Sequence, residues 1–328
     1  MRIFDYICLF VIITSVGTIY KKYLDKIDKD EEFIEYDAIK KYLLNDSSIT
    51  KNNKPIIWVH IPYEYNSRLW ESFYSRNSND LNLQYLNLTI KSIIEHNTNF
   101  NICLIDDNSF MNLIPGWTVD ITTKGDPIKS KLRNLCLYKL LYTYGGIIVP
   151  SSFLCLQSLE QTHNNCIQNG KPYVFENINK SFSNSINITY GPDISFIGSN
   201  KNNSIIKDLC DFTEKVISDD FTSDSNFSGI FNKWCLQSIN NKKMTILDGN
   251  TIGIKDVKNK PIYAEELLAN NTINFIDEQS LLGIYIPMKD ILSKNSLSWF
   301  NNLTFDKLLK SKMNISKYFV LSLSNNSN

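Results

Sequence analysis

The sequence predicts an α/β fold in which a mostly parallel central sheet is flanked by helices. Short apolar runs typical of buried strands alternate with longer amphipathic segments typical of helices. The 328-residue chain is 43% hydrophobic, which is sufficient for one substantial core. A strand, a helix and a second strand follow one another near the start of the domain, and this order implies a right-handed βαβ unit with parallel strands.

The βαβ unit begins directly after Pro55. Residues 56–61 read Ile-Ile-Trp-Val-His-Ile between two prolines, which predicts a short buried strand. Apolar residues recur on one helical face over residues 84–96, and the run 101–107 predicts a second strand. We therefore expect ligands beyond the carboxyl ends of these two strands.

Two acids, Asp106 and Asp107, end the second predicted strand. At the carboxyl edge of the sheet they could hold the ribose of a nucleotide. They could also cap a short helix over residues 109–113. We favour capping, because short acids after a strand often begin helices.

The clearest helix in the sequence spans residues 129–144 and ends at Gly145 and Gly146. Gly145 is expected to end the helix in the left-handed conformation, and Gly146 to let the next strand pass close beneath it. That strand, residues 147–149, is apolar throughout, so we expect both of its faces to be buried. Later segments predict strands over 173–176, 194–198, 244–247, 252–254 and 283–287 and helices over 204–218 and 299–309.

The chain divides into four predicted segments. Residues 1–22 form a membrane anchor or signal segment, residues 23–54 a polar stem, residues 55–320 one domain and residues 321–328 a disordered tail. The apolar run over residues 6–20 is short for a bilayer, which needs about 20 residues of helix. We favour a single-pass N-terminal anchor, with a cleaved signal peptide and a buried helix as alternatives. The side of the membrane that the domain faces stays open.

Composition and charge exclude some classes of function. The formal net charge is zero, with 34 basic and 34 acidic residues, so no basic surface for nucleic acid is predicted. The seven cysteines include no CxxC pair and predict no disulfide framework. The three histidines have no cysteines or acids at metal-ligand spacing, which predicts structural or surface roles for them. The oligomeric state is not specified by any of these features.

Residues 140–152 read Leu-Leu-Tyr-Thr-Tyr-Gly-Gly-Ile-Ile-Val-Pro-Ser-Ser. This run resembles the active-site entrance of the DxD glycosyltransferases that build capsular polysaccharides and yeast mannan, which reads roughly Leu-Tyr-x-Tyr-Gly-Gly, an apolar run and Asp-x-Asp. The resemblance spans roughly residues 55–215 and rests on the order of elements plus the Tyr-Gly-Gly turn. It implies a GT-A-like nucleotide-sugar-binding fold, with Gly145 and Gly146 beside a nucleotide-sugar or glycan ligand.

Four positions depart together from the family pattern. The two metal-binding acids of the family fall on Pro150 and Ser152, and its Asp-x-x-Arg falls on Asn134 and Leu137. Such transferases usually stabilise the departing diphosphate with a divalent cation held by carboxylates, and neither proline nor serine replaces a carboxylate. We therefore expect no divalent metal and no metal-dependent sugar transfer, and whether the chain is an enzyme stays open.

Other charged residues could supply part of this chemistry. Arg133 lies close to the lost positions, with Lys124, Lys129 and Lys131 nearby, and such cations could neutralise a diphosphate without metal. A solvated basic start of the helix is the simpler interpretation. Asp193 is a spare acid before a predicted strand and a candidate contact for a nucleotide sugar.

Three functions are compatible with these residues. The first is a membrane-anchored, glycosyltransferase-like protein that has lost metal-dependent transfer and binds a glycan, a nucleotide or a protein partner. The second is an active, metal-independent glycosyltransferase in which Arg133 and the nearby lysines stabilise the leaving diphosphate. The third is a structural membrane-associated component, for instance of a virus particle.

Overall fold

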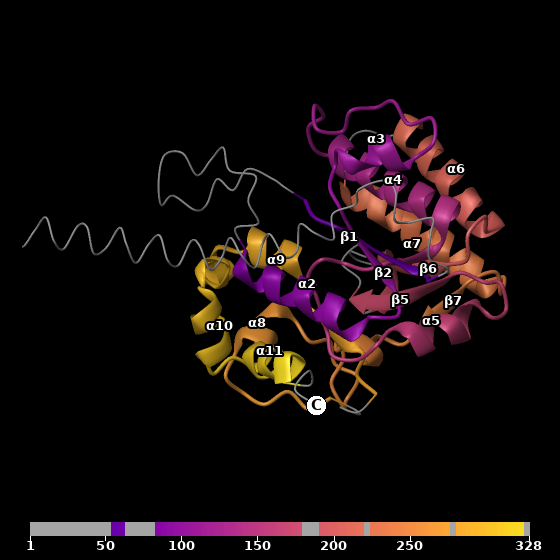
Figure 1. Ribbon diagram of the computed structural model, residues 1–328. Helices are drawn as coiled ribbons and strands as arrows, with labels where there is room; N and C mark the ends of the chain where they lie inside the picture. Colours follow the sequence, from indigo (N-terminus) through magenta and orange to yellow (C-terminus); the bar gives the residue numbers. More distant parts are fainter. Residues whose placement is uncertain (1–53, 63–82, 179–189, 220–223, 276–279, 325–328) are drawn as a thin grey trace, which may run out of the picture. The chain divides into compact units, whose positions relative to one another are not determined.

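The computed structural model describes residues 54–62, 83–178, 190–219, 224–275 and 280–324 (Figure 1). The predicted N-terminal anchor and, except for Lys54, the predicted stem lie outside these ranges. Within them, no helix combines the length and the apolar composition needed to cross a membrane.

A six-stranded sheet forms the centre of the described part. Its strands, in spatial order, are β2 (Asn101–Ile105), β1 (Ile56–His60), β3 (Gly146–Ile148), β6 (Tyr190–Ser199), β5 (Tyr173–Ile178) and β7 (Thr245–Leu247). β1 runs parallel to both of its neighbours and β5 runs parallel to β7, whereas β6 is antiparallel to β3 and to β5. The prediction of an α/β fold with a mostly parallel sheet is confirmed, and the antiparallel β6 makes the sheet mixed.

The direction in which the chain adds strands reverses at β1. The chain runs from β1 through α2 (Gln84–His96) to β2 on one side. It then passes through α3 (Ser109–Leu113) and α4 (Ile128–Tyr144) to β3 on the other side of β1. Open α/β sheets bind ligands outside the carboxyl ends of the strands at such a reversal. The edge where β1, β2 and β3 end is therefore the position at which this fold favours a ligand site.

Helices flank the sheet. Figure 1 shows α3, α4, α6 (Ser204–Asp219) and α7 (Asp224–Asn240) on one side, and α2 with the C-terminal helices on the other. α2 packs against β4 (Phe153–Cys155), which pairs antiparallel with β8 (Gly283–Tyr285) in a small second sheet. The remaining elements are α5 (Glu160–Ile167), η2 (Gly249–Ile252), α8 (Ala264–Leu268), α9 (Met288–Ser293), η3 (Asn295–Asn302), α10 (Phe305–Lys310) and α11 (Asn314–Ser324).

The hydrophobic core lies on both faces of the central strands. Trp58, Ile105 and Ile197 belong to one cluster with buried side chains of α4 and α6. Their chain neighbours Val59 and Leu104 are also fully buried. Because successive side chains of a strand point to opposite faces, burial of both sets requires cover on both sides of the sheet. This explains why uninterrupted apolar runs, rather than alternating ones, predicted the strands.

α4 ends at two glycines because the backbone there excludes a side chain. The N–H of Gly145 donates to the carbonyl of Leu141 (2.9 Å), and φ of Gly145 is +73°. A Cβ at Gly145 would lie 2.7 Å from the backbone nitrogen of Lys201, and one at Gly146, where φ is +100°, would collide with the carbonyl oxygen of Ile56. The expected positive φ is confirmed, but a ψ of −165° places Gly145 outside the left-handed helical region.

Two predictions about the last third of the chain are wrong. Residues 252–254, predicted as a strand, instead lie where η2 ends: Ile252 is its last residue, and Gly253 after it adopts the left-handed conformation (φ +67°, ψ +27°). The carboxylate of Asp248 caps η2 by accepting the backbone N–H two residues further on (2.9 Å), which favours the helical turn over a strand. The single helix predicted over residues 299–309 is interrupted at Leu303, between η3 and α10.

The predicted disordered tail begins inside a helix. α11 continues to Ser324, where the described part of the chain stops. Ser322 is 1% exposed, and its hydroxyl donates to the carbonyl of Cys155 in β4 (3.1 Å). This contact fixes the end of α11, so the prediction of disorder is wrong for residues 321–324.

Candidate functional site

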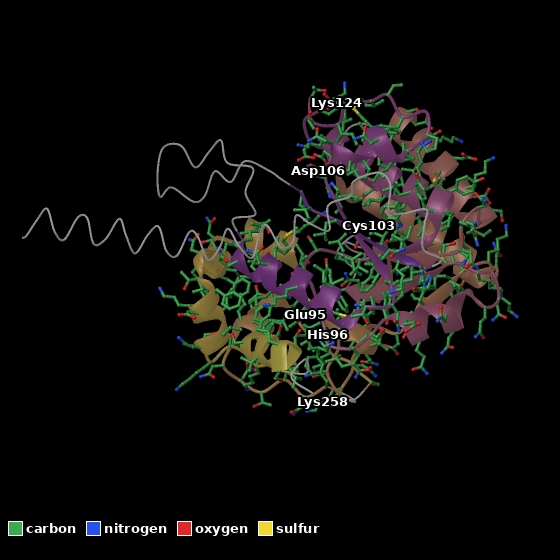
Figure 2. All side chains as sticks on the ribbon, in the orientation of Figure 1. Glu95, His96, Cys103, Asp106, Lys124 and Lys258 are labelled. Atoms are coloured by element: carbon green, nitrogen blue, oxygen red, sulfur yellow. The ribbon has the colours of Figure 1, made fainter. Side chains whose placement is uncertain are left out.

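Polar side chains meet where the parallel strands end. β1 ends at His60, and β2 is followed by Asp106 and Asp107, so these three residues lie at the carboxyl edge of the sheet. Figure 2 labels Asp106 at this edge, beyond Cys103, which lies within β2. α4 brings the side chain of Arg133 to the same place.

Asp107 is the centre of an ion-pair cluster. The guanidinium of Arg133 donates through Nε to Oδ1 and through Nη2 to Oδ2 of Asp107, both at 2.7 Å. His60 Nε2 lies 3.0 Å from Oδ1, and Lys129 Nζ lies 3.6 Å from Oδ2. Asp107 and Arg133 are 9% and 7% exposed, so the pair is largely removed from water. Two parallel charge-assisted bonds make this the strong form of an Arg–carboxylate contact.

The protonation states in this cluster follow from burial and pairing. Burial raises the pKa of Asp107, but hydrogen bonds with His60 and Arg133 outweigh it and hold that pKa well below its usual value. Burial lowers the pKa of His60, against the opposing attraction of Asp107, so His60 is neutral at pH 7. A carboxylate only accepts hydrogen bonds, and Nε2 of His60 therefore carries the proton. The imidazole also stacks on Phe110, with ring centroids 5.5 Å apart.

The basic residues predicted around Arg133 do not act as one group. Arg133 and Lys129 both contact Asp107. The side chain of Lys131 is buried, at 1% exposure, whereas Lys124 is exposed. The interpretation of a solvated basic helix start is therefore wrong for Arg133 and Lys131, which are buried, and right for Lys124.

The two family acid positions, Pro150 and Ser152, lie in a closed turn. The N–H of Phe153 donates to the carbonyl of Pro150 (3.0 Å), and the N–H of Ile286 donates to the carbonyl of Ser152 (3.1 Å). Ser152 is 3% exposed, and the carbonyl of Ser151 between them accepts from the hydroxyl of Thr89 in α2 (2.6 Å). The two positions together offer one hydroxyl and no carboxylate.

The residues at the family positions do not fit a divalent cation. Asn134 and Leu137 are half-buried on α4 and, like Pro150 and Ser152, carry no charge. Hard divalent cations prefer carboxylate oxygens, which all four positions lack. Elsewhere in the described ranges, no three histidines, cysteines or acids come close enough together to hold a metal ion.

Asp106 has a local structural role. Its Oδ1 accepts hydrogen bonds from the backbone N–H (2.9 Å) and the hydroxyl (2.6 Å) of Ser109, the first residue of α3. In return, Ser109 Oγ accepts from the N–H of Asp106 (3.1 Å). These contacts close the turn that leads into α3, whose N-cap residue, Asn108, makes no side-chain cap hydrogen bond. Asp106 and Asp107 thus differ: the first closes the turn before α3 and the second binds Arg133.

Gly145 and Gly146 lie at the opposite edge of the sheet from Asp107. Gly146 begins β3, pairs with Ser199 and lies against the carbonyl of Ile56, the first residue of β1. Both glycines are therefore at the amino end of the parallel strands. Their position gives them a structural role in the approach of α4 to β3, and it places them away from the carboxyl edge.

Asp193 does lie at the carboxyl edge, because β6 runs antiparallel and begins there. Its Oδ1 accepts from the N–H (2.8 Å) and the hydroxyl (2.6 Å) of Ser195, and its Oδ2 accepts from the side-chain amide of Asn177 (2.6 Å). Asp193 is half-buried and Ser195 is exposed. The acid that the sequence singled out is thus part of a hydrogen-bonded group on β5 and β6.

A second ion-pair cluster, absent from the sequence predictions, lies where β5 and β7 end. Lys255 is 8% exposed and pairs with Glu176 of β5 and with Asp248, whose Oδ1 lies 3.1 Å from Lys255 Nζ. The Tyr190 ring covers the ammonium at 4.4 Å. Burial lowers the pKa of Lys255, but the two carboxylates outweigh it and raise that pKa above its usual value. The cluster holds η2 against β5, because the N–H of Gly249 also donates to Glu176 (3.1 Å).

Two site residues that the sequence did not predict, His60 and Glu176, share a position at or near the end of a strand. His60 ends β1 and Glu176 lies near the end of β5, the same kind of position that marked Asp106 and Asp107. The rule that ligand-facing polar groups follow strand ends would have found both. Lys255 has no such signal, because it follows a segment predicted as a strand that forms a helical turn.

Comparisons with models of known protein families and with curated proteins find no match to this chain.

Proposed function

We propose that this chain has a GT-A-like fold and is a glycosyltransferase-like protein without metal-dependent transfer, which binds a glycan or a nucleotide sugar. The mixed α/β sheet with its strand reversal at β1 supports the nucleotide-sugar-binding part of this proposal. The resemblance of residues 140–152 to the DxD glycosyltransferases supports the sugar-transferase ancestry. Fold alone does not give function, so the proposal rests mainly on the site.

The turn at Pro150–Ser152 is the main evidence for the absence of metal-dependent transfer. Main-chain hydrogen bonds close it on both sides, and the side chain of Ser152 is buried. A metal that bridges diphosphate oxygens needs anionic oxygen ligands facing the ligand. Neither position provides one.

The state of Arg133 favours a binding protein over a metal-independent transferase. The fork of its guanidinium binds Asp107, and the side chain is 7% exposed. His60 is neutral and Arg133 offsets Asp107, so within this cluster the charge of Lys129 alone remains for an anionic ligand. A diphosphate leaving group requires more concentrated positive charge than one partly exposed lysine supplies.

Attachment to a membrane through residues 1–22 is part of the proposal, as the apolar run there suggests. A structural role in an assembly, such as a virus particle, has no specific contact in its favour.

Thermal unfolding of the purified full-length chain tests the proposal. UDP-, GDP- and CMP-sugars are added with Mn²⁺ and, separately, with EDTA. We expect at least one ligand to raise the unfolding temperature equally in both conditions, because binding stabilises the folded state by mass action. A stabilisation that appears only with Mn²⁺ would contradict the proposal.

The alternative of metal-independent transfer has its own test. If Arg133 stabilises a leaving diphosphate, then Arg133→Ala abolishes EDTA-resistant turnover of a sugar nucleotide, while Lys124→Ala, which changes an exposed lysine, leaves it intact. Under the proposed function, we expect the wild-type chain itself to show no turnover.

A further inference from the structure

A second polar group lies at the carboxyl edge, apart from the Asp107 cluster. We call it the tyrosine–amide cluster, and it consists of Tyr85 in α2, Asn177 in β5, Asp193 in β6 and Tyr285 in β8. Four different elements thus contribute one side chain each. Such convergence of polar side chains from separate elements is typical of binding sites rather than of local turns.

Asn177 links the members of this cluster. Its amide donates to Asp193 Oδ2 (2.6 Å), and its side chain lies near enough to Tyr285 to oppose the rise that burial causes in the pKa of that phenol. Asn177, Asp193 and Tyr285 are each half-buried, so part of each side chain remains accessible to solvent. The exposed Ser195 continues the group by donating its hydroxyl to Asp193 Oδ1 (2.6 Å).

Tyr85 contributes a buried hydroxyl without a hydrogen-bond partner. Its side chain is 1% exposed, its ring packs on Phe300 (4.9 Å between centroids), and its hydroxyl is among the buried polar atoms that bond to nothing. Buried polar groups are almost always satisfied in folded proteins. An unpaired phenol therefore points to a partner that the described part of the chain does not provide.

The path of α2 brings Tyr85 towards Tyr285. Thr89, one turn after Tyr85, donates to the carbonyl of Ser151 (2.6 Å), next to β4, and Phe153 of β4 lies opposite Tyr285 in β8. Burial raises the pKa of Tyr85, and Tyr285 raises it further, which agrees with this placement. The buried phenol therefore belongs with the half-buried members of the cluster.

The chemistry of the cluster selects the class of ligand. Phenols and an amide both donate and accept hydrogen bonds, and a carboxylate accepts up to four. Sugar hydroxyls, which donate and accept, match this set. A phosphate would be repelled by Asp193, whose neighbours in the cluster are all uncharged. The Asp107 cluster, by contrast, contains two cations, Arg133 and Lys129.

We propose that the tyrosine–amide cluster binds a neutral sugar ring. The carboxylate of Asp193 accepts from one sugar hydroxyl, and the amide of Asn177 donates to a neighbouring one. The hydroxyl of Tyr85 gains its missing hydrogen bond from the ligand. This inference rests on the proposed glycan-binding function and specifies its site. In this proposal the sugar is recognised without a metal ion and without a diphosphate.

Binding of free neutral sugars to the full-length chain tests this assignment. Glucose, galactose, mannose and N-acetylglucosamine are titrated in EDTA, and the unfolding temperature is measured. At least one sugar should raise it, and Tyr85→Phe and Asp193→Asn should each weaken that binding at least tenfold. Tyr85→Phe should not lower the unfolding temperature of the sugar-free protein, because the hydroxyl it removes makes no hydrogen bond.

Tyr144→Phe is the matched control. It removes a phenol whose hydroxyl donates to the carbonyl of Leu113 (2.8 Å) and which precedes Gly145, at the amino edge. It should destabilise the protein yet keep the sugar affinity. If no neutral sugar binds, or if Tyr85→Phe and Asp193→Asn bind as the wild type does, the inference fails. Stabilisation by a sugar nucleotide in EDTA would then still leave the proposed function standing, whereas Mn²⁺-dependent binding would overturn that function itself.

Discussion

Arg133 binds the carboxylate of Asp107 through two hydrogen bonds of 2.7 Å, between side chains that are 7% and 9% exposed. The arginine that the sequence offered to a diphosphate is therefore committed to an acid of its own chain. Removing one member of such a buried pair leaves the other charge without compensation. The pair thus joins α4 to the carboxyl edge beside β1 and β2.

Asp107→Asn should lower the free energy of unfolding by about 3 kcal/mol, because Arg133 would keep its charge in a buried place and lose its carboxylate. Urea unfolding followed by circular dichroism measures the change. Lys129→Ala is the control: its ammonium lies 3.6 Å from Asp107 and is more exposed, so the expected loss is below about 1 kcal/mol. Equal losses in the two variants would show that the bidentate pair has no special weight.

Stability should fall as the pH decreases from about 6.5 to 4. Burial lowers the pKa of His163 to about 4, so in this interval the unfolded chain binds a proton that the folded chain does not. The unfolded state therefore gains relative to the folded state at acidic pH, and the stability is fully present above the unfolded pKa. His163→Gln removes this titration, and its urea midpoint should decline less between about pH 7 and pH 5 than that of the wild type.

His60→Gln should change the pH dependence in the same direction, because burial lowers the pKa of His60 as well. The two variants differ in what else they disturb: His60 bonds to Asp107 (3.0 Å), whereas His163 Nδ1 bonds to the hydroxyl of Tyr173 (2.9 Å). Identical slopes of stability against pH in the wild type and both variants would refute the assignment of these histidines as neutral and buried.

Gly146→Ala should destabilise the protein by at least about 2 kcal/mol, because the new methyl group would meet the carbonyl of Ile56 at a φ of +100°. Gly125→Ala is the matched control, since nothing lies within 4 Å of its Cβ position and its φ is not positive. Thermal unfolding of both variants measures the difference. A neutral Gly146→Ala would mean that α4 and β3 do not approach as closely as described.

Ser152→Asp introduces an acid at a position where the DxD glycosyltransferases carry one, but it should not create metal binding. The side chain at this position is 3% exposed within the turn, so the new carboxylate would be buried without a partner, at a cost of about 2 kcal/mol or more. Ser158→Asp, at an exposed position before α5, should be nearly neutral. Urea unfolding in the presence and absence of Mn²⁺ compares them, and stabilisation of Ser152→Asp by Mn²⁺ would be the unexpected result.

The prediction was most accurate for elements in which the local sequence pattern and the packing in the fold favour the same secondary structure. The helix at residues 84–96 and the glycine-terminated helix before β3 have the predicted extent because periodicity, turn chemistry and burial all favour them. The segment 252–254 was misread because a short apolar run containing Gly253 suits a strand and a helical turn alike. There the cap from Asp248 decided the outcome.

The sites were harder to predict than the strands. Asp106 and Asp107 are adjacent and chemically identical, yet one closes the turn before α3 and the other binds Arg133, a residue 26 positions away. Contacts over such separations depend on the fold, which local pattern does not encode. Tyr85 illustrates the same limit, because only the packed structure distinguishes an unpaired phenol from an ordinary core tyrosine.

The central claim is that the carboxyl edge binds a sugar-type ligand without metal-dependent transfer. Turnover of UDP-, GDP- and CMP-sugars by the full-length chain, measured with Mn²⁺ and with EDTA, tests it most directly. We expect no release of free nucleotide above the uncatalysed rate in either condition. Nucleotide release that requires Mn²⁺ would contradict it.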